Sequence, residues 1–253
     1  MSLLSPTGPL PPTSSTLMQA LQQDGLPPLG LYLLAVDWLV QWQRSTLASA
    51  LAPCDPTLLR DELEWFPRWY VAEHRKFTLD AAQRSTLDSA FTAITASNLG
   101  GPRVAIHREF TPENLTFPLG SVAPKDPRSG PITYDIASLV RSPCVRCDED
   151  FCLDVTIRYW ERARKVALPV CDDFGEFYRA VEWMGLQRDL MALGDFARNS
   201  QHSGETPQQV DAPRLIAAVR ATCSRYGTLK PLLRLIERVE GIETPSAYSF
   251  GRI

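Results

Sequence analysis

Residues 104–117 read VAIHREFTPENLTF and lie in a chain whose other segments mostly have helical patterns. Val104 and Ile106 predict a short strand over 103–107, and Leu115 to Phe117 predict a second one. Between the two strands, the loop carries a histidine, an arginine, a carboxylate and an asparagine five residues after the carboxylate. The stretch therefore predicts a small β element inside a mainly α domain, with a loop that carries several side chains suited to catalysis or binding.

On both sides of this stretch, apolar residues recur at steps of three and four, which is typical of helices with one buried face. Asp55-Pro56 has the pattern of an N-cap followed by a first-turn proline, and Asp80 with Gln83 has the spacing of a capping box. Pro67 is expected to kink or end its helix. The predicted helices cover 29–44, 55–66, an offset segment with Trp69, Tyr70 and His74, 80–99, 135–140, 149–167, 174–199, 214–225 and 229–239.

The composition is that of an ordinary globular protein. Among 253 residues, 44% are hydrophobic and 22% are charged, and the net charge is −3. This balance gives no electrostatic reason to expect nucleic acid or an anionic membrane as a partner. No apolar run approaches the roughly 18 residues of a membrane span, and the first residues lack a signal-peptide pattern. A soluble, cytoplasmic protein is expected.

Six cysteines are too few for a disulfide scaffold in a chain of this size. Cys144, Cys147 and Cys152 form a C-x2-C-x4-C run, but a zinc site normally needs a fourth ligand at comparable spacing, and the nearest downstream histidine is His202. Free thiols are the simpler interpretation, and a metal site is the alternative.

The order strand, His-Arg-acid, Asn and strand is the layout of a kinase catalytic loop. In that layout the acid, here Glu109, lies beside an acceptor hydroxyl and takes its proton. The Asn, here Asn114, folds back to bind the magnesium ion that bridges the phosphates. His107 and Arg108 are candidates for the catalytic site, or they orient the loop without reacting. Asp135, ahead of an apolar helix, is expected to be an N-cap.

Beyond this loop, the chain resembles the aminoglycoside phosphotransferase superfamily, and within it the bacterial N-acetylmuramate/N-acetylglucosamine anomeric kinases. The resemblance implies a kinase-like C-terminal lobe, Mg and ATP as cofactors, and phosphoryl transfer to the anomeric hydroxyl of an amino sugar in cell-wall recycling. It rests on the following stretches: DELEWFPRWYVAEH at 61–74, AQRSTLDSAF at 82–91, PRVAIHREFTPENL at 102–115, GPITYDIASLVR at 130–141, EWMGLQRDLMALGDFAR at 182–198 and DAPRLIAAVRATCSRYGTLKPLLRLI at 211–236.

Several positions depart from the family pattern. Glu109 replaces the catalytic Asp, which moves the carboxylate by one methylene. The family's Asp-Phe-Gln-Asp sequence falls on Ala123, Pro124, Lys125 and Asp126, so the resemblance leaves Asn114 and Asp126 as candidate metal ligands, with Glu113 as a substitute. Gln187 and Arg188 match the family, whereas Asp189 and Met191 replace an expected His and Lys. These changes predict weak turnover and an altered sugar pocket.

The resemblance also implies an organisation along the chain. We expect a flexible arm or hinge remnant over 1–16, a helical lobe over 17–240 and a tail over 241–253. The family's N-terminal β lobe, with its glycine-rich loop and phosphate-binding lysine, is expected to be absent, because Lys76 is the first lysine. A separate chain carrying that lobe, or a homodimer, is then a possible partner.

The sequence thus predicts a truncated, catalytically impaired ATP-dependent sugar or aminoglycoside phosphotransferase. Two alternatives stay open. One is a non-catalytic, pseudokinase-like protein that binds an amino sugar or a partner protein. The other is a decaying gene product.

Overall fold

The computed structural model describes residues 14–23, 28–120, 123–203 and 210–242, and these are mainly helical with one small sheet. Most of the expected arm (1–16) and tail (241–253) lies outside the described residues. The elements are α1 Leu17–Leu21, α2 Pro28–Ser45, a 3-10 turn Ala48–Ala50, α3 Pro56–Trp65, a π-helix Phe66–His74, α4 Ala81–Leu99, β1 Arg103–Ile106, β2 Arg128–Pro131, α5 Thr133–Val140, α6 Glu149–Lys165, α7 Phe174–Ser203, α8 Ala212–Arg225, a 3-10 turn Gly227–Leu229 and α9 Lys230–Glu240.

The capping signals read from the sequence are confirmed. The Asp55 carboxylate accepts from the backbone N–H of Leu58 at 2.9 Å and opens α3, with Pro56 in its first turn. Asp80 and Gln83 form a reciprocal capping box that opens α4, with distances of 2.8 and 2.9 Å. These short-range bonds satisfy N–H groups that a helix start leaves without partners, so local sequence fixes where both helices begin.

The α-helical geometry ends where Pro67 predicts it, because α3 ends at Trp65 and a π-helix with Pro67 in its first turn follows. The backbone continues from α3 into the π-helix, whose last turn is closed by a 2.9 Å bond from the N–H of Arg75 to the carbonyl of Tyr70. Proline lacks an N–H, and the wider coil accommodates it without a break. Gly194 of α7 lies against this junction. A Cβ at Gly194 would lie 2.5 Å from the carbonyl carbon of Trp65, so only glycine permits this approach.

The sheet pairs β1 with a strand that the sequence pattern did not indicate. β1 is confirmed, but its antiparallel partner is β2, with Val104 opposite Gly130. The second strand predicted at Leu115 to Phe117 is wrong. The backbone there pairs instead with the start of the described chain: the Phe117 carbonyl accepts from the N–H of Ser14 at 2.7 Å, and the Phe117 N–H donates to the Ser15 carbonyl at 2.9 Å.

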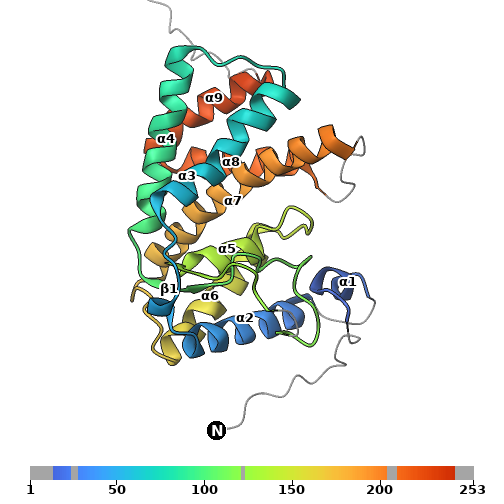
Figure 1. Ribbon diagram of the computed structural model, residues 1–253, viewed down its shortest axis with the longest axis vertical. Helices are drawn as coiled ribbons and strands as arrows, with labels where there is room; N and C mark the ends of the chain where they lie inside the picture. Colours follow the sequence, from blue (N-terminus) through green and yellow to red (C-terminus); the bar gives the residue numbers. More distant parts are fainter. Residues whose placement is uncertain (1–13, 24–27, 121–122, 204–209, 243–253) are drawn as a thin grey trace, which may run out of the picture.

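Two apolar clusters fill the molecule, one at each end of its long axis (Figure 1). The lower cluster lies among α2, α5, α6 and the sheet, and the upper one among α3, α4, α8 and α9. The long helix α7 supplies side chains to both, for example Met184 to the lower cluster and Leu190 to the upper one. The loop after β1 packs on the lower cluster through Phe110.

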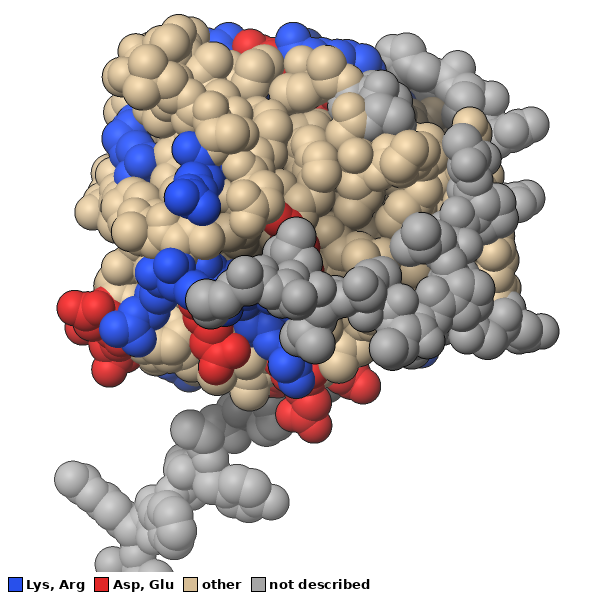
Figure 2. Space-filling model, turned by 90° about the horizontal axis from the view of Figure 1, so that it is seen from below, with Lys and Arg blue, Asp and Glu red and all other residues tan. Residues whose placement is uncertain are grey.

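Surface charge at the lower end is mixed. Figure 2 shows basic and acidic side chains gathered beside one another on this face, next to a wide area without charged groups. Arg162 of α6 pairs with Asp37 of α2 at 3.2 Å.

No helix in the described parts of the chain is both long enough and apolar enough to cross a membrane.

Candidate functional site

The loop that follows β1 is fixed by a buried carboxylate on α5. Asp135 accepts from the backbone N–H of His107 at 2.7 Å and from that of Arg108 at 3.0 Å. Asp135 is fully buried, and burial raises its pKa to about 6 against the opposing effect of these two bonds. The expected N-cap role is wrong, because α5 begins earlier, at Thr133, and its N-cap residue Ile132 makes no side-chain cap bond. Asp135 is a positioning residue for the loop.

Arg108 points into the protein. Its φ of 69° lies in the left-handed region, which turns the chain sharply after β1. Its guanidinium donates to Glu62 at 3.2 Å and pairs with Asp126. Glu62 in turn accepts from the Tyr134 hydroxyl at 2.9 Å and from Gln187 at 3.0 Å. Arg108 therefore ties the loop to α3, α5 and α7.

His107 is enclosed by aromatic rings. Its ring centroid lies 5.8 Å from that of Trp38, 5.6 Å from that of Trp42 and 5.7 Å from that of Phe110. Burial lowers the pKa of its imidazole, so the neutral form is favoured at pH 7. Its Nδ1 is buried and has no hydrogen-bond partner among the described residues. This environment favours the orienting role over the reacting one.

Glu109 and Asn114 meet at one small cavity. The cavity has a volume of about 30 Å³, and Ala123 lines it as well. That space holds about one water molecule. The Lys125 ammonium lies 3.6 Å from the Glu109 carboxylate. The structure thus brings together the loop acid, the loop amide and the segment of 123–126.

The carboxylates around this cavity are held by other groups of the chain. Glu113 accepts from the Ser142 hydroxyl at 3.0 Å. Asp126 pairs with Arg108 and with Arg128, the latter at 2.9 Å. The described residues contain no group of three or more His, Cys, Asp or Glu side chains that could hold a metal ion.

Magnesium needs hard oxygen ligands in octahedral geometry, commonly one or two carboxylates together with phosphate oxygens and water. Here the cavity offers the carboxylate of Glu109, already paired with Lys125, and the amide of Asn114. A methyl group at Ala123 adds no ligand. The residues present do not fit a resident magnesium ion.

The residues expected near the sugar pocket are engaged in packing. Arg188 donates to the Tyr134 hydroxyl at 2.8 Å, and Gln187 accepts from Asn98 at 2.8 Å. Asp189 is buried against Arg141, whose Nε lies 3.1 Å away. These contacts connect α7 to α4 and α5. Sequence reasoning missed Glu62 and the loop-anchoring role of Asp135, because both depend on long-range contacts.

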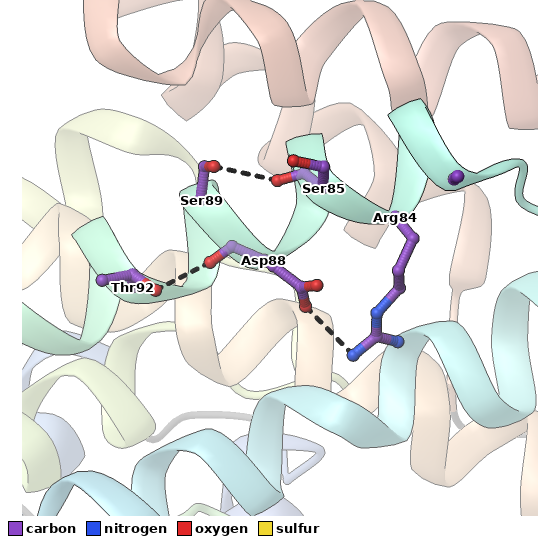
Figure 3. Close-up of a pocket in the computed structure, with 6 residues that line it drawn as sticks. Arg84, Ser85, Asp88, Ser89 and Thr92 are labelled. Atoms are coloured by element: carbon purple, nitrogen blue, oxygen red, sulfur yellow. Dashed lines mark hydrogen bonds and ion pairs between the residues drawn. The ribbon is translucent and has the colours of Figure 1, made fainter.

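A more voluminous hollow than the cavity of Glu109 and Asn114 lies along one face of α4. It has a volume of about 630 Å³ and is open to solvent. Figure 3 shows Arg84 and Asp88 turned toward one another, and they lie 3.1 Å apart. The Ser89 and Thr92 hydroxyls donate to carbonyls one turn earlier, at 2.9 and 2.8 Å. The polar side chains that line this hollow bond to one another or to the backbone of α4. They do not form a catalytic arrangement.

No protein-family model matches this chain, but three known proteins with sugar-kinase names are similar to it. Each relative is named N-acetylmuramate/N-acetylglucosamine kinase. The one from Neisseria meningitidis serogroup B is 36% identical over 84% of this chain and 65% of its own length. Those from Pseudomonas putida and Pseudomonas aeruginosa are 33% and 31% identical, over 83% and 80% of this chain and 63% and 61% of their own lengths. The chain spans slightly less than two thirds of each relative.

Proposed function

We propose that this chain derives from an ATP-dependent amino-sugar phosphotransferase of the aminoglycoside phosphotransferase type and retains little turnover. The observation that carries the proposal is the shared cavity of Glu109 and Asn114, on a loop anchored by Asp135. The names of the relatives support an amino sugar as acceptor.

In the proposed reaction, the sugar hydroxyl oxygen bonds to the γ-phosphorus of ATP while the bond to the β–γ bridging oxygen breaks and ADP leaves. Glu109 receives the hydroxyl proton. Asn114 faces the same space and positions the reacting groups. His107, Arg108 and Asp135 hold the loop and take no part in the bond changes.

Two features of this loop support low turnover. The Glu109 carboxylate sits one methylene farther from the backbone than an aspartate, and a displacement of about 1 Å can cost about a hundredfold in rate. Lys125 pairs with the Glu109 carboxylate at 3.6 Å and competes with an acceptor hydroxyl for its oxygens. Ala123 supplies no metal ligand, although phosphoryl transfer depends mainly on positioning and charge neutralisation.

A non-catalytic binding role is the second candidate. It is favoured by the internal ion pairs that occupy Asp126 and Glu109. On this account the protein binds an amino sugar or a partner protein and transfers no phosphoryl group.

The two candidates are separated by offering N-acetylmuramate or N-acetylglucosamine with Mg-ATP and measuring sugar phosphate by mass spectrometry. We expect a slow product signal that Glu109→Gln abolishes. Binding of the sugar by calorimetry with no product above that of Glu109→Gln would favour the non-catalytic role. Absence of both binding and product would contradict the phosphotransferase proposal and would leave a partner protein as the only ligand of the second candidate.

A further inference from the structure

Two cysteines flank the start of α6 at positions whose side chains meet. Asp148 is the N-cap, because its carboxylate accepts from the N–H of Phe151 at 2.8 Å. Cys147 is then the residue before the cap, and Cys152 is the fourth residue of the helix. Side chains at these two positions commonly pack against each other across a helix start. The spacing C-D-E-D-F-C therefore brings two thiols together without any long-range constraint.

The contacts agree with this placement. The Cys147 and Cys152 thiols lie close enough for each to shift the pKa of the other. The Cys147 sulfur also lies 3.3 Å from the Tyr32 hydroxyl, and Cys152 donates to the carbonyl of Val140 at 3.3 Å. Both cysteines are partly exposed, whereas Cys54 and Cys223 are completely buried. A small oxidant can reach the pair.

The surroundings of the two thiols give them different pKa values, which makes Cys147 the nucleophile and Cys152 its partner. The neighbouring Cys152 thiol, with a further contribution from the Tyr32 hydroxyl, lowers the pKa of Cys147 to about 7. The proximity of Cys147, together with burial, raises the pKa of Cys152. Cys144 lies in the same loop, but burial raises its pKa to about 11. Thiolate is the form that attacks peroxides and disulfides, so Cys147 is the reactive member.

We propose that Cys147 and Cys152 form a redox-active dithiol that hydrogen peroxide converts to an intramolecular disulfide. The Cys147 thiolate attacks one peroxide oxygen, the O–O bond breaks, hydroxide leaves, and Cys147 becomes a sulfenic acid. The Cys152 sulfur then attacks the Cys147 sulfur, and the S–O bond breaks with release of water. In total two thiols and one peroxide give one disulfide and two water molecules.

The test treats the folded full chain with hydrogen peroxide, blocks remaining thiols with iodoacetamide under denaturing conditions, and digests with trypsin. Residues 147–158, CDEDFCLDVTIR, form one tryptic peptide that contains both cysteines, and Cys144 falls in a different peptide. We expect this peptide to become two hydrogens lighter and to carry no alkyl group, with the other four cysteines alkylated. A peptide that stays doubly alkylated, or oxidation that strikes all six cysteines equally, would overturn the proposal.

Three substitutions sharpen the result. Cys152→Ser should trap the sulfenic acid on Cys147, which dimedone then labels, and Cys147→Ser should leave Cys152 reduced. Cys171→Ser is the matched control, since Cys171 is also partly exposed but lies beyond the far end of α6, and it should leave disulfide formation unchanged. Dimedone labelling of Cys152 in the Cys147→Ser protein at the rate seen for Cys147 would contradict the assignment of the nucleophile.

Discussion

At the scale of single residues, one carboxylate on α5 decides where the loop lies. Asp135 accepts hydrogen bonds from two backbone N–H groups of the loop. The turn of the loop itself gives these two groups no regular backbone partner. Buried N–H groups without partners cost free energy, so this acceptor pair fixes the loop independently of any ligand. The position of Glu109 depends on it.

Asp135→Ala should therefore destabilise the fold. The substitution leaves two buried N–H groups unsatisfied, and we expect the free energy of unfolding to fall by about 2 kcal/mol or more in urea titration. Asp154→Ala is the matched control, because Asp154 pairs with Arg158 on the surface and should cost less than about 1 kcal/mol. Equal effects of the two substitutions would argue against an anchoring role for Asp135.

The raised pKa of Asp135 predicts that the stability of the fold depends on pH. The pKa of Asp135 is about 6 in the folded protein and near its ordinary value of about 4 when unfolded. Between these values the folded state binds a proton that the unfolded chain has released, so this group stabilises the fold at pH 4 and loses that contribution as pH rises through 6. The stability advantage of the native protein over Asp135→Asn should shrink from pH 4 to pH 7 by on the order of 2 kcal/mol. A pH-independent difference would refute the assignment.

Ala123 gives a gain-of-function prediction. Ala123→Asp places a second carboxylate at the cavity of Glu109 and Asn114, which should raise Mg²⁺ affinity at least about tenfold. The measurement is calorimetric titration with magnesium chloride, with Ala50→Asp as an exposed control in the 3-10 turn before α3. If Ala123→Asp binds no more magnesium than Ala50→Asp does, position 123 cannot supply a metal ligand to this cavity.

At the scale of elements, the helices were predictable because their starting signals are local. Asp55 and Asp80 cap α3 and α4 through residues three positions away. The second strand was not predictable in the same way. Arg128–Pro131 has no strand pattern of its own, and it pairs with β1 only because Gly130 fits against Ile106 and Cys54. The spacing of Glu109 and Asn114 suggested that they lie near each other, whereas the network around Glu62 required the fold.

Packing between α7 and the π-helix depends on Gly194. Gly194→Ala would place a methyl group 2.5 Å from the backbone of Trp65, so the helices must separate, and we expect a loss of about 1–3 kcal/mol in urea unfolding. Gly227→Ala is the control, because a Cβ there meets no atom within 4 Å. A stability loss at Gly194 no larger than at Gly227 would show that the junction tolerates a side chain.

At the scale of the whole molecule, α7 joins the two apolar clusters into one body (Figure 1). Phe110 packs the loop of 107–114 on the lower cluster, and Gln187 of α7 links to α3 through Glu62. The contacts of Asp135 and Arg108 thus hold the loop in place without using the side chain of Glu109 or Ala123.

The most direct test places aspartate at positions 109 and 123, where the resembled kinase family has it. Wild-type protein and the double variant Glu109→Asp with Ala123→Asp are compared for formation of sugar phosphate from Mg-ATP and N-acetylmuramate. We predict that the double variant is faster by about a hundredfold or more, since the carboxylate returns by one methylene and a metal ligand is added. A folded double variant that is no faster than the wild type would contradict the claim that residues 107–114 form an eroded phosphoryl-transfer loop.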